Sequence, residues 1–238
     1  MSQDSRSLRE LYPFLHGDRQ DAASLDAALL ESVRQKAAHS LEAKQRFFAD
    51  NGQAVVAAAR AIADVYQRGG RMLSMGNGGS SCDAAHFAVE FLHPITAGRP
   101  ALTATNLSSD EAMMTAVGND VGFDHIFVRQ VIAHARAEDG LVGFSTSGNS
   151  NNLLKAFVKA KQMGLITIGL AGGDGGAMAK SAAIDHCLVV ATDSVHRVQE
   201  VHVATYHILW DLVHTLLADA RGGLADAGTA RDDSEATR

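Results

Sequence analysis

A histidine and a glutamate lie shortly after a glycine-rich stretch of the sequence. The segment MGNGGSSCDAAHFAVEF, residues 75–91, passes from small residues into a helix-like run that carries His86 and Glu90. Residues four positions apart share one face of an α-helix, so the imidazole and the carboxylate are expected side by side. Two interpretations stay open: the pair could ligate a metal ion over a bound ligand, or it could be an ordinary surface pair.

Two loops of small and hydroxyl residues are candidates for binding a phosphate group. The first is GNGGSS, residues 76–81, whose glycines let the backbone approach a ligand because they lack a Cβ atom. The second is STSGNS, residues 145–150, which offers four hydroxyls and precedes a helix whose N-terminus favours an anion. Together they look like a phosphate cradle built without a lysine, although glycine and serine can also simply fill turns.

A helical segment near the end of the chain carries further polar side chains. Its sequence, HRVQEVHVATYHILWDLVHTLL, contains Gln199, Glu200, His202, His207 and His214. Most of these are interpreted as ordinary helix residues. In that interpretation His202 and His214 simply flank the apolar face of the helix.

The elements that must position these residues follow from the hydrophobic pattern. Residues 21–50 and 52–70 are expected to form two helical segments, the second ending at Gly69 and Gly70. Short apolar runs then alternate with helical stretches, which predicts a parallel sheet covered by helices on both faces. The runs are 71–75, 101–107, 141–145, 165–170 and 186–191; the helical stretches are 82–92, 110–117, 123–137, 151–163, 177–182 and 197–218. Ligands of such sheets bind beyond the carboxyl ends of the strands, where both loops are expected.

Composition and charge exclude several classes of protein. The chain has 238 residues, of which 46% are hydrophobic, and its formal net charge is -6. This charge argues against direct binding to nucleic acid or to an anionic membrane. With no apolar run near the length of a membrane span and no apolar signal core at the start, a cytoplasmic location is expected. Cys82 and Cys187 are too few for a disulfide scaffold, and each is expected to be a small buried side chain.

Five motifs in order resemble the sugar isomerase (SIS) domain of the phosphoheptose isomerases. They are GNGGSSCDAAHFAVEF, AVGNDVGFDHIFVRQ, STSGNSNNLLKA, AGGDGGAMA and RVQEVHVATYHIL. The resemblance spans about residues 41–218 and implies a doubly wound, flavodoxin-like parallel sheet flanked by helices. It implies a SIS domain (41–220) after a largely helical extension (1–40). Residues 221–238 are small and polar and cannot bury enough area to fold, so they are expected to form a disordered tail. The implied activity is the interconversion of sedoheptulose 7-phosphate and D-glycero-D-manno-heptose 7-phosphate.

The resemblance also implies roles for single residues. The first loop would hold substrate through Asn77, Gly78, Gly79 and Ser80, and the sugar would be contacted by Asn119 and Asp120. The second loop would bind phosphate through Ser145, Thr146, Ser147 and Ser150. A zinc ion would be held by His86, Glu90, Gln199 and His207, with Glu90 and Gln199 also touching substrate. Proton transfer through an enediol would fall to Glu90 and His207.

One site residue departs from the resemblance, since His196 stands where relatives often have an aspartate. The resemblance also implies a homotetramer with active sites at subunit boundaries. On one straight helix, Gln199 and His207 would be about 12 Å apart along the axis at 1.5 Å per residue, which is awkward for one metal ion. Either a neighbouring subunit supplies a ligand or the helix begins only after Gln199. The alternative function is a catalytically silent SIS domain that binds sugar phosphates or associates with a replication initiator protein.

Overall fold

The computed structural model describes residues 22–220 of the chain. The chain divides into two compact units, residues 1–39 and 40–238. In the first unit, the described residues are the beginning of helix α2 (Ala22–Gln67). There the side chains of Leu25, Leu29, Leu30 and Val33 are exposed. The disordered tail expected at 221–238, and the start of the expected extension, lie outside the described residues.

The expectation of two separate N-terminal helical segments is wrong, because α2 runs through Gly52 without a break. One glycine inside a helix costs only about 1 kcal/mol relative to alanine. The alanine-rich residues that follow bury Val55, Ala59 and Ile62 in the core of the second unit, which outweighs this cost. The helix ends at Gln67, close to the predicted end at Gly69, whose φ of +80° an L-side chain rarely adopts.

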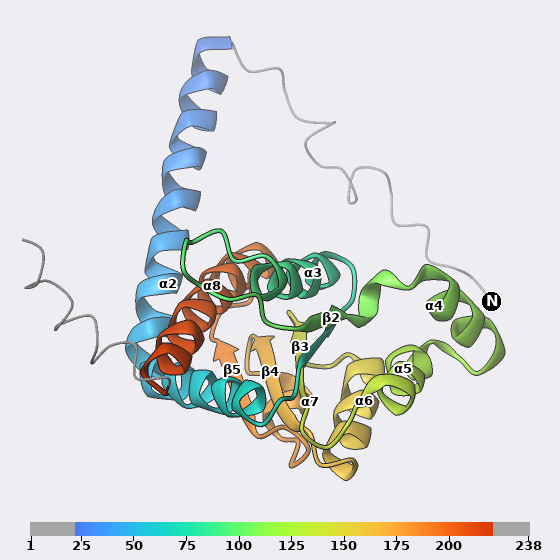
Figure 1. Ribbon diagram of the computed structural model, residues 1–238. Helices are drawn as coiled ribbons and strands as arrows, with labels where there is room; N and C mark the ends of the chain where they lie inside the picture. The colour runs from blue at the N-terminus through green and yellow to red at the C-terminus, as the bar shows by residue number, and fades with distance from the viewer. Residues whose placement is uncertain (1–21, 221–238) are drawn as a thin grey trace, which may run out of the picture. The chain divides into compact units, whose positions relative to one another are not determined.

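Five parallel strands form the sheet of the second unit (Figure 1). They are β1 (Met72–Gly76), β2 (Ala104–Asn106), β3 (Gly140–Ser145), β4 (Ile166–Gly172) and β5 (His186–Val190). Their order in the sheet is β2-β1-β3-β4-β5, with Met72 of β1 in register with Ala104 of β2 and Gly140 of β3. This order is the flavodoxin-like doubly wound topology, so the predicted fold class is confirmed.

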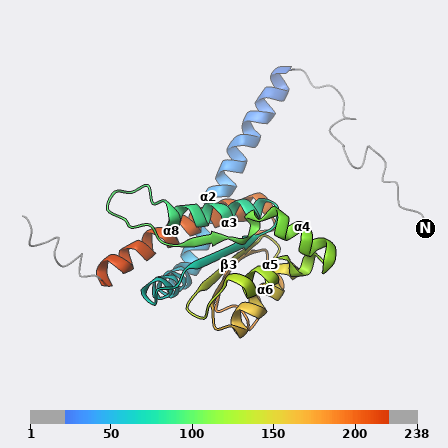
Figure 2. The ribbon, with the colours of Figure 1, turned by 45° about the vertical axis from the view of Figure 1, so that its right-hand side comes forward.

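Helices cover both faces of the sheet. They are α3 (Gly79–Leu92), α4 (Glu111–Asp120), α5 (Ile126–His134), α6 (Asn151–Gln162), α7 (Gly176–Ala179) and α8 (Val195–Ala220), with 3-10 turns η2 (Leu107–Ser109) and η3 (Phe123–His125). Figure 2 shows α3 and α8 on one side of the sheet and α5 and α6 on the other. Alternate residues of β3 point to the two layers: Phe144 packs with Phe87 of α3, and Leu141 packs on the α5 and α6 side. The predicted two-sided cover is therefore present.

Some expected boundaries change because burial, rather than local pattern, sets where an element ends. The apolar run 101–107 is a strand only over Ala104–Asn106, and the stretch 123–137 contains η3 followed by α5.

Cys82 is exposed and Cys187 is partly buried, so the expectation of a buried side chain is wrong for Cys82. Among residues 22–220, no helix has the length and apolar character required to cross a membrane.

Candidate active site

The two predicted loops lie at the switch point of the sheet. Strands β1 and β3 are neighbours, and the chain leaves them toward α3 and α6 on opposite faces. At such a point the loops diverge and leave a crevice beyond the strand ends. Two hydrogen bonds between Asn77 and Asn152 join the loops: each side-chain amide donates to the other's carbonyl oxygen, at 3.0 and 2.8 Å. Sequence reasoning did not single out Asn152, which is buried at the start of α6.

The first loop is a tight turn that requires glycine at positions 76 and 78. A Cβ atom on Gly76 would lie 2.1 Å from the carbonyl oxygen of Ser80, and Gly78 has a φ of +53°. The Ser80 amide donates to the Asn77 carbonyl at 3.0 Å. On the other side, Ser108 of η2 bonds both the amide (3.1 Å) and the carbonyl (2.9 Å) of Gly76. The backbone of the loop is thus fixed before any ligand binds.

The second loop keeps hydroxyls available above the N-terminus of α6. Ser145 and Ser150 share a hydrogen bond of 3.0 Å between their hydroxyl oxygens. The Ser147 hydroxyl accepts from the Asn149 amide at 3.2 Å, which leaves its own proton able to donate. Ser150 makes no side-chain capping bond to the first turn of α6, and Thr146 is half-buried beside it. These groups have the donor chemistry that a phosphate requires.

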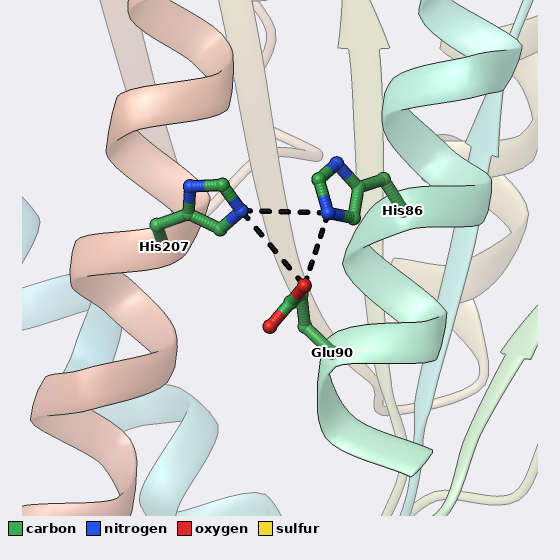
Figure 3. A group of neighbouring side chains, drawn as sticks. All are labelled: His86, Glu90 and His207. Atoms are coloured by element: carbon green, nitrogen blue, oxygen red, sulfur yellow. Dashed lines mark hydrogen bonds and ion pairs between the residues drawn. The ribbon is translucent and has the colours of Figure 1, made fainter. Parts of the chain in front are cut away.

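Three side chains from two helices form a compact cluster (Figure 3). His86 and Glu90 of α3 are 3.0 Å apart between Nε2 and Oε1. From α8, His207 Nε2 lies 3.5 Å from His86 Nε2 and 3.9 Å from Glu90 Oε1. The Glu90 side chain is 24% exposed, so a small molecule can reach it. The i, i+4 pair expected from the sequence is present, and α8 adds the second histidine.

The cluster suits a divalent metal ion such as zinc. Its three ligand atoms lie within 4.8 Å of one another. Tetrahedral zinc, with bonds of about 2.0–2.2 Å, separates neighbouring ligand atoms by about 3.4 Å. The observed spacings bracket that value, and two imidazoles with one carboxylate are a known zinc ligand set that leaves a position for substrate.

Other predicted residues are not gathered with this cluster in the described chain. Helix α8 begins at Val195, so the alternative in which it starts after Gln199 is wrong. The Gln199 side chain instead packs on the first loop, where a Cβ atom on Gly79 would lie 2.2 Å from its Nε2 atom. Asn119 and Asp120 are exposed at the end of α4 and hydrogen-bond to each other at 2.7 Å. Figures 1 and 2 show α4 at the opposite side of the sheet from α8.

Two aromatic residues of α8 support the cluster and were missed by sequence reasoning. The Tyr206 hydroxyl lies 2.7 Å from His86 Nδ1, and the Trp210 indole donates to the Glu90 carbonyl at 2.8 Å. Burial, with the negative charges of Asp83 and Glu90, raises the pKa of Tyr206. In the sequence, Tyr206 and Trp210 fall at helical spacing among the apolar residues of this segment. The pattern therefore indicates only that they pack in the core.

Two buried ionisable groups lie beneath the cluster. Burial raises the pKa of Asp83 to about 6, although the nearby His86 opposes this shift. Burial lowers the pKa of His202 to about 4, and its Nε2 lies 3.4 Å from the Ala171 carbonyl oxygen. His202 and His214 are both buried on α8, in keeping with a packing role for them rather than a ligand role.

Comparisons with known proteins identify the family of the chain. Residues 36–172 match the SIS domain family. The chain is 44% identical over 178 residues to a phosphoheptose isomerase of Solidesulfovibrio magneticus, covering 75% of this chain and 86% of that protein. Among solved structures it is similar to a phosphoheptose isomerase from Francisella tularensis (TM-score 0.74, 34% identity, 78% of this chain and 98% of that one). It is likewise similar to one from Neisseria gonorrhoeae (TM-score 0.73, 38% identity, 79% and 99%). The chain therefore belongs to the phosphoheptose isomerase family of SIS-domain enzymes.

Proposed function

We propose that this chain isomerises sedoheptulose 7-phosphate to D-glycero-D-manno-heptose 7-phosphate. The observation that carries the proposal is the cluster of Glu90 with His86 and His207. Helix α3, which carries His86 and Glu90, begins in the first of the two loops that can bind phosphate. His86 is seven positions after Gly79 on α3, a rise of about 10 Å. A substrate with its phosphate at one end and its carbonyl at the other suits a site with these two parts.

The reaction requires one proton to move between adjacent carbons and another to move between their oxygens. In the proposed mechanism Glu90 and His207 carry these protons through an enediol, since both side chains are accessible and adjacent. A divalent metal ion held by His86, Glu90 and His207 would polarise the substrate carbonyl and stabilise oxyanion charge. The Glu90 carboxylate would then have two roles, as a ligand of the metal ion and as the group that moves a proton.

The substrate would be held from both ends of the crevice. Asn77, Gly78, Gly79 and Ser80 would present backbone and amide groups to the sugar, and Gln199 would reach it from α8 across Gly79. Ser145, Thr146, Ser147 and Ser150 would bind the phosphate with the N-terminus of α6.

We further propose that the enzyme is a cytoplasmic homotetramer whose catalytic domain is residues 41–220. Asn119 and Asp120, distant from α8 in one chain, would then serve the site of a neighbouring subunit, and a neighbouring Gln199 could complete the metal ligands. Exposed apolar side chains on α3, α8 and the loop after α3 support burial against another subunit: Val89, Leu92, Ile95 and Ile208.

The test is an isomerase assay of the full chain with sedoheptulose 7-phosphate, repeated with Glu90→Gln. Because general acid–base catalysis contributes about 10²–10⁴-fold, kcat should fall at least about 10²-fold in the variant. Glu42→Gln, which changes an exposed carboxylate that pairs with Arg46 on α2, should retain full activity. Binding of the sugar phosphate without turnover by the wild-type protein, with or without zinc, would favour the silent binding domain instead.

A further inference from the structure

The hydroxyl of Tyr206 is placed to control which nitrogen of His86 carries the proton. Its oxygen lies 2.7 Å from His86 Nδ1, and the two rings meet edge to face with centroids 5.2 Å apart. Tyr206 is 1% exposed and also packs against Phe144 and His207. The bond is therefore shielded from water, and the tyrosine ring is held by its neighbours.

A neutral imidazole has one N–H group and one lone pair, so the partner of one nitrogen determines the state of the other. An ionised Glu90 can only accept a hydrogen bond, which requires His86 Nε2 to carry the proton at their 3.0 Å contact. The lone pair then lies on Nδ1, and Tyr206 must donate to it. When Nε2 binds a cation instead, the proton moves to Nδ1 and the tyrosine oxygen must accept it.

A phenol hydroxyl can serve both states because it both donates and accepts, whereas a carboxylate or a backbone carbonyl could only accept. In the second state the Tyr206 proton requires another acceptor. Asp83, one turn before His86 on α3, has a buried carboxylate oxygen, Oδ2, without a hydrogen-bond partner among the described residues. Its negative charge is one of the causes that raise the pKa of Tyr206, so Asp83 is the anion on α3 that would favour the Tyr206 proton in the second state.

We propose that Tyr206 is a positioning residue that sets the tautomer of His86. It donates to Nδ1 while His86 is bonded to Glu90, and it accepts from Nδ1 when Nε2 binds a divalent cation. This inference rests on the metal role in the proposed function, but it concerns cation binding and not turnover. Metal-bound histidines are commonly oriented by a hydrogen bond at their other nitrogen, and loss of such a bond weakens binding about 10–100-fold.

The first experiment measures zinc affinity of the full chain by competition with a chromophoric chelator. Tyr206→Phe, which removes only the hydroxyl, should bind zinc about 10–100-fold more weakly than wild type. Tyr66→Phe is the matched control: its hydroxyl donates to the Thr103 carbonyl at 3.3 Å and not to a residue of the cluster. Equal zinc affinity of Tyr206→Phe and wild type would overturn the proposal, as would the absence of zinc binding by the wild type.

The second experiment reads the tautomer directly by 15N NMR of histidine-labelled protein and needs no variant. His86 should carry its proton on Nε2 in the metal-free protein and on Nδ1 after zinc is added. The same tautomer in both states would overturn the proposal. Failure of the proposed function is distinguishable, because a wild type that binds zinc and switches tautomer without isomerising the sugar would leave the Tyr206 inference intact.

Discussion

At the scale of single residues, Glu90 is held at both its backbone and its side chain. The Trp210 indole bonds its carbonyl and His86 bonds its carboxylate, so two helices determine where this group lies. The proton transfer proposed for Glu90 would benefit from such placement, since misplacement by about 1 Å can cost 10²-fold in rate. The Arg99 guanidinium lies 4.6 Å from the Trp210 ring centre and extends this support outward.

Ser147 is a second single residue with a testable role: its hydroxyl is exposed and is still free to donate a hydrogen bond. We expect Ser147→Ala to weaken sugar-phosphate affinity about tenfold or more, since a hydrogen bond to a charged group contributes roughly 1.5–3 kcal/mol. Calorimetry measures the change. Ser181→Ala is the control: its hydroxyl also accepts from the amide two residues later, but it precedes β5 at the other end of the sheet. Unchanged affinity for Ser147→Ala would remove this residue from the site.

At the scale of elements, α8 supplies both chemistry and packing. One part of its surface contributes Tyr206 and His207 to the cluster, and its apolar positions bury Val201 and Leu209 against the sheet. His202 lies within this packed surface and bonds the end of β4. The position of the cluster residues of α8 thus depends on the packing of the whole helix.

The buried imidazole of His202 should make stability depend on pH. The pKa of His202 is about 4 in the folded chain and 6.5 when the imidazole is exposed. At pH values between these two pKa values, the imidazole therefore takes up a proton when the chain unfolds. The unfolding free energy should therefore be at its full value above pH 6.5 and fall as pH drops toward 4, by at most about 3 kcal/mol. His202→Gln should remove this part of the pH dependence of the unfolding free energy, whereas His93→Gln, which changes an exposed histidine, should leave that dependence unchanged. Denaturant titrations of the metal-free protein from pH 4 to 7 measure it, and identical slopes for His202→Gln and wild type would contradict the assignment.

At the scale of the whole molecule, one chain brings some of the proposed site residues together and keeps others apart. Glu90 and His207 meet within one chain. Asp120 is the last residue of α4, which lies at the right of Figure 1, whereas α8 lies at the left. Under the proposed tetramer, Asp120 would serve a neighbour's site. The two pairs should therefore behave differently when variant subunits are mixed.

Mixed tetramers of Glu90→Gln and His207→Ala subunits should remain inactive, because every site lacks one member of the same-chain pair. Mixtures of Glu90→Gln with Asp120→Ala should regain activity, since a site with intact Glu90 can receive Asp120 from its neighbour. Native mass spectrometry would verify mixing, and the isomerase assay would measure recovery. Recovery in the first mixture, or none in the second, would contradict this division of the site.

The sequence by itself determined the order of the elements and the two loops between strands and helices. Buried strands read as short apolar runs, and glycines mark turns such as the one at Gly78, because these signals depend on residues close in the chain. The pairing of His86 with Glu90 was predictable for the same reason: the helix repeat sets it. The parallel sheet followed from the alternation of strands and helices.

Only the tertiary structure decided which distant residues meet. The bond from Tyr206 to His86 and the pair of Asn77 with Asn152 join segments 120 and 75 residues apart. It also decided that Gln199 lies on Gly79, since the helix rise predicts the separation of Gln199 from His207 but not the residue that each one contacts. Local periodicity specifies a helix face, but which helices pack together depends on burial summed over the whole chain, which no short stretch of sequence contains.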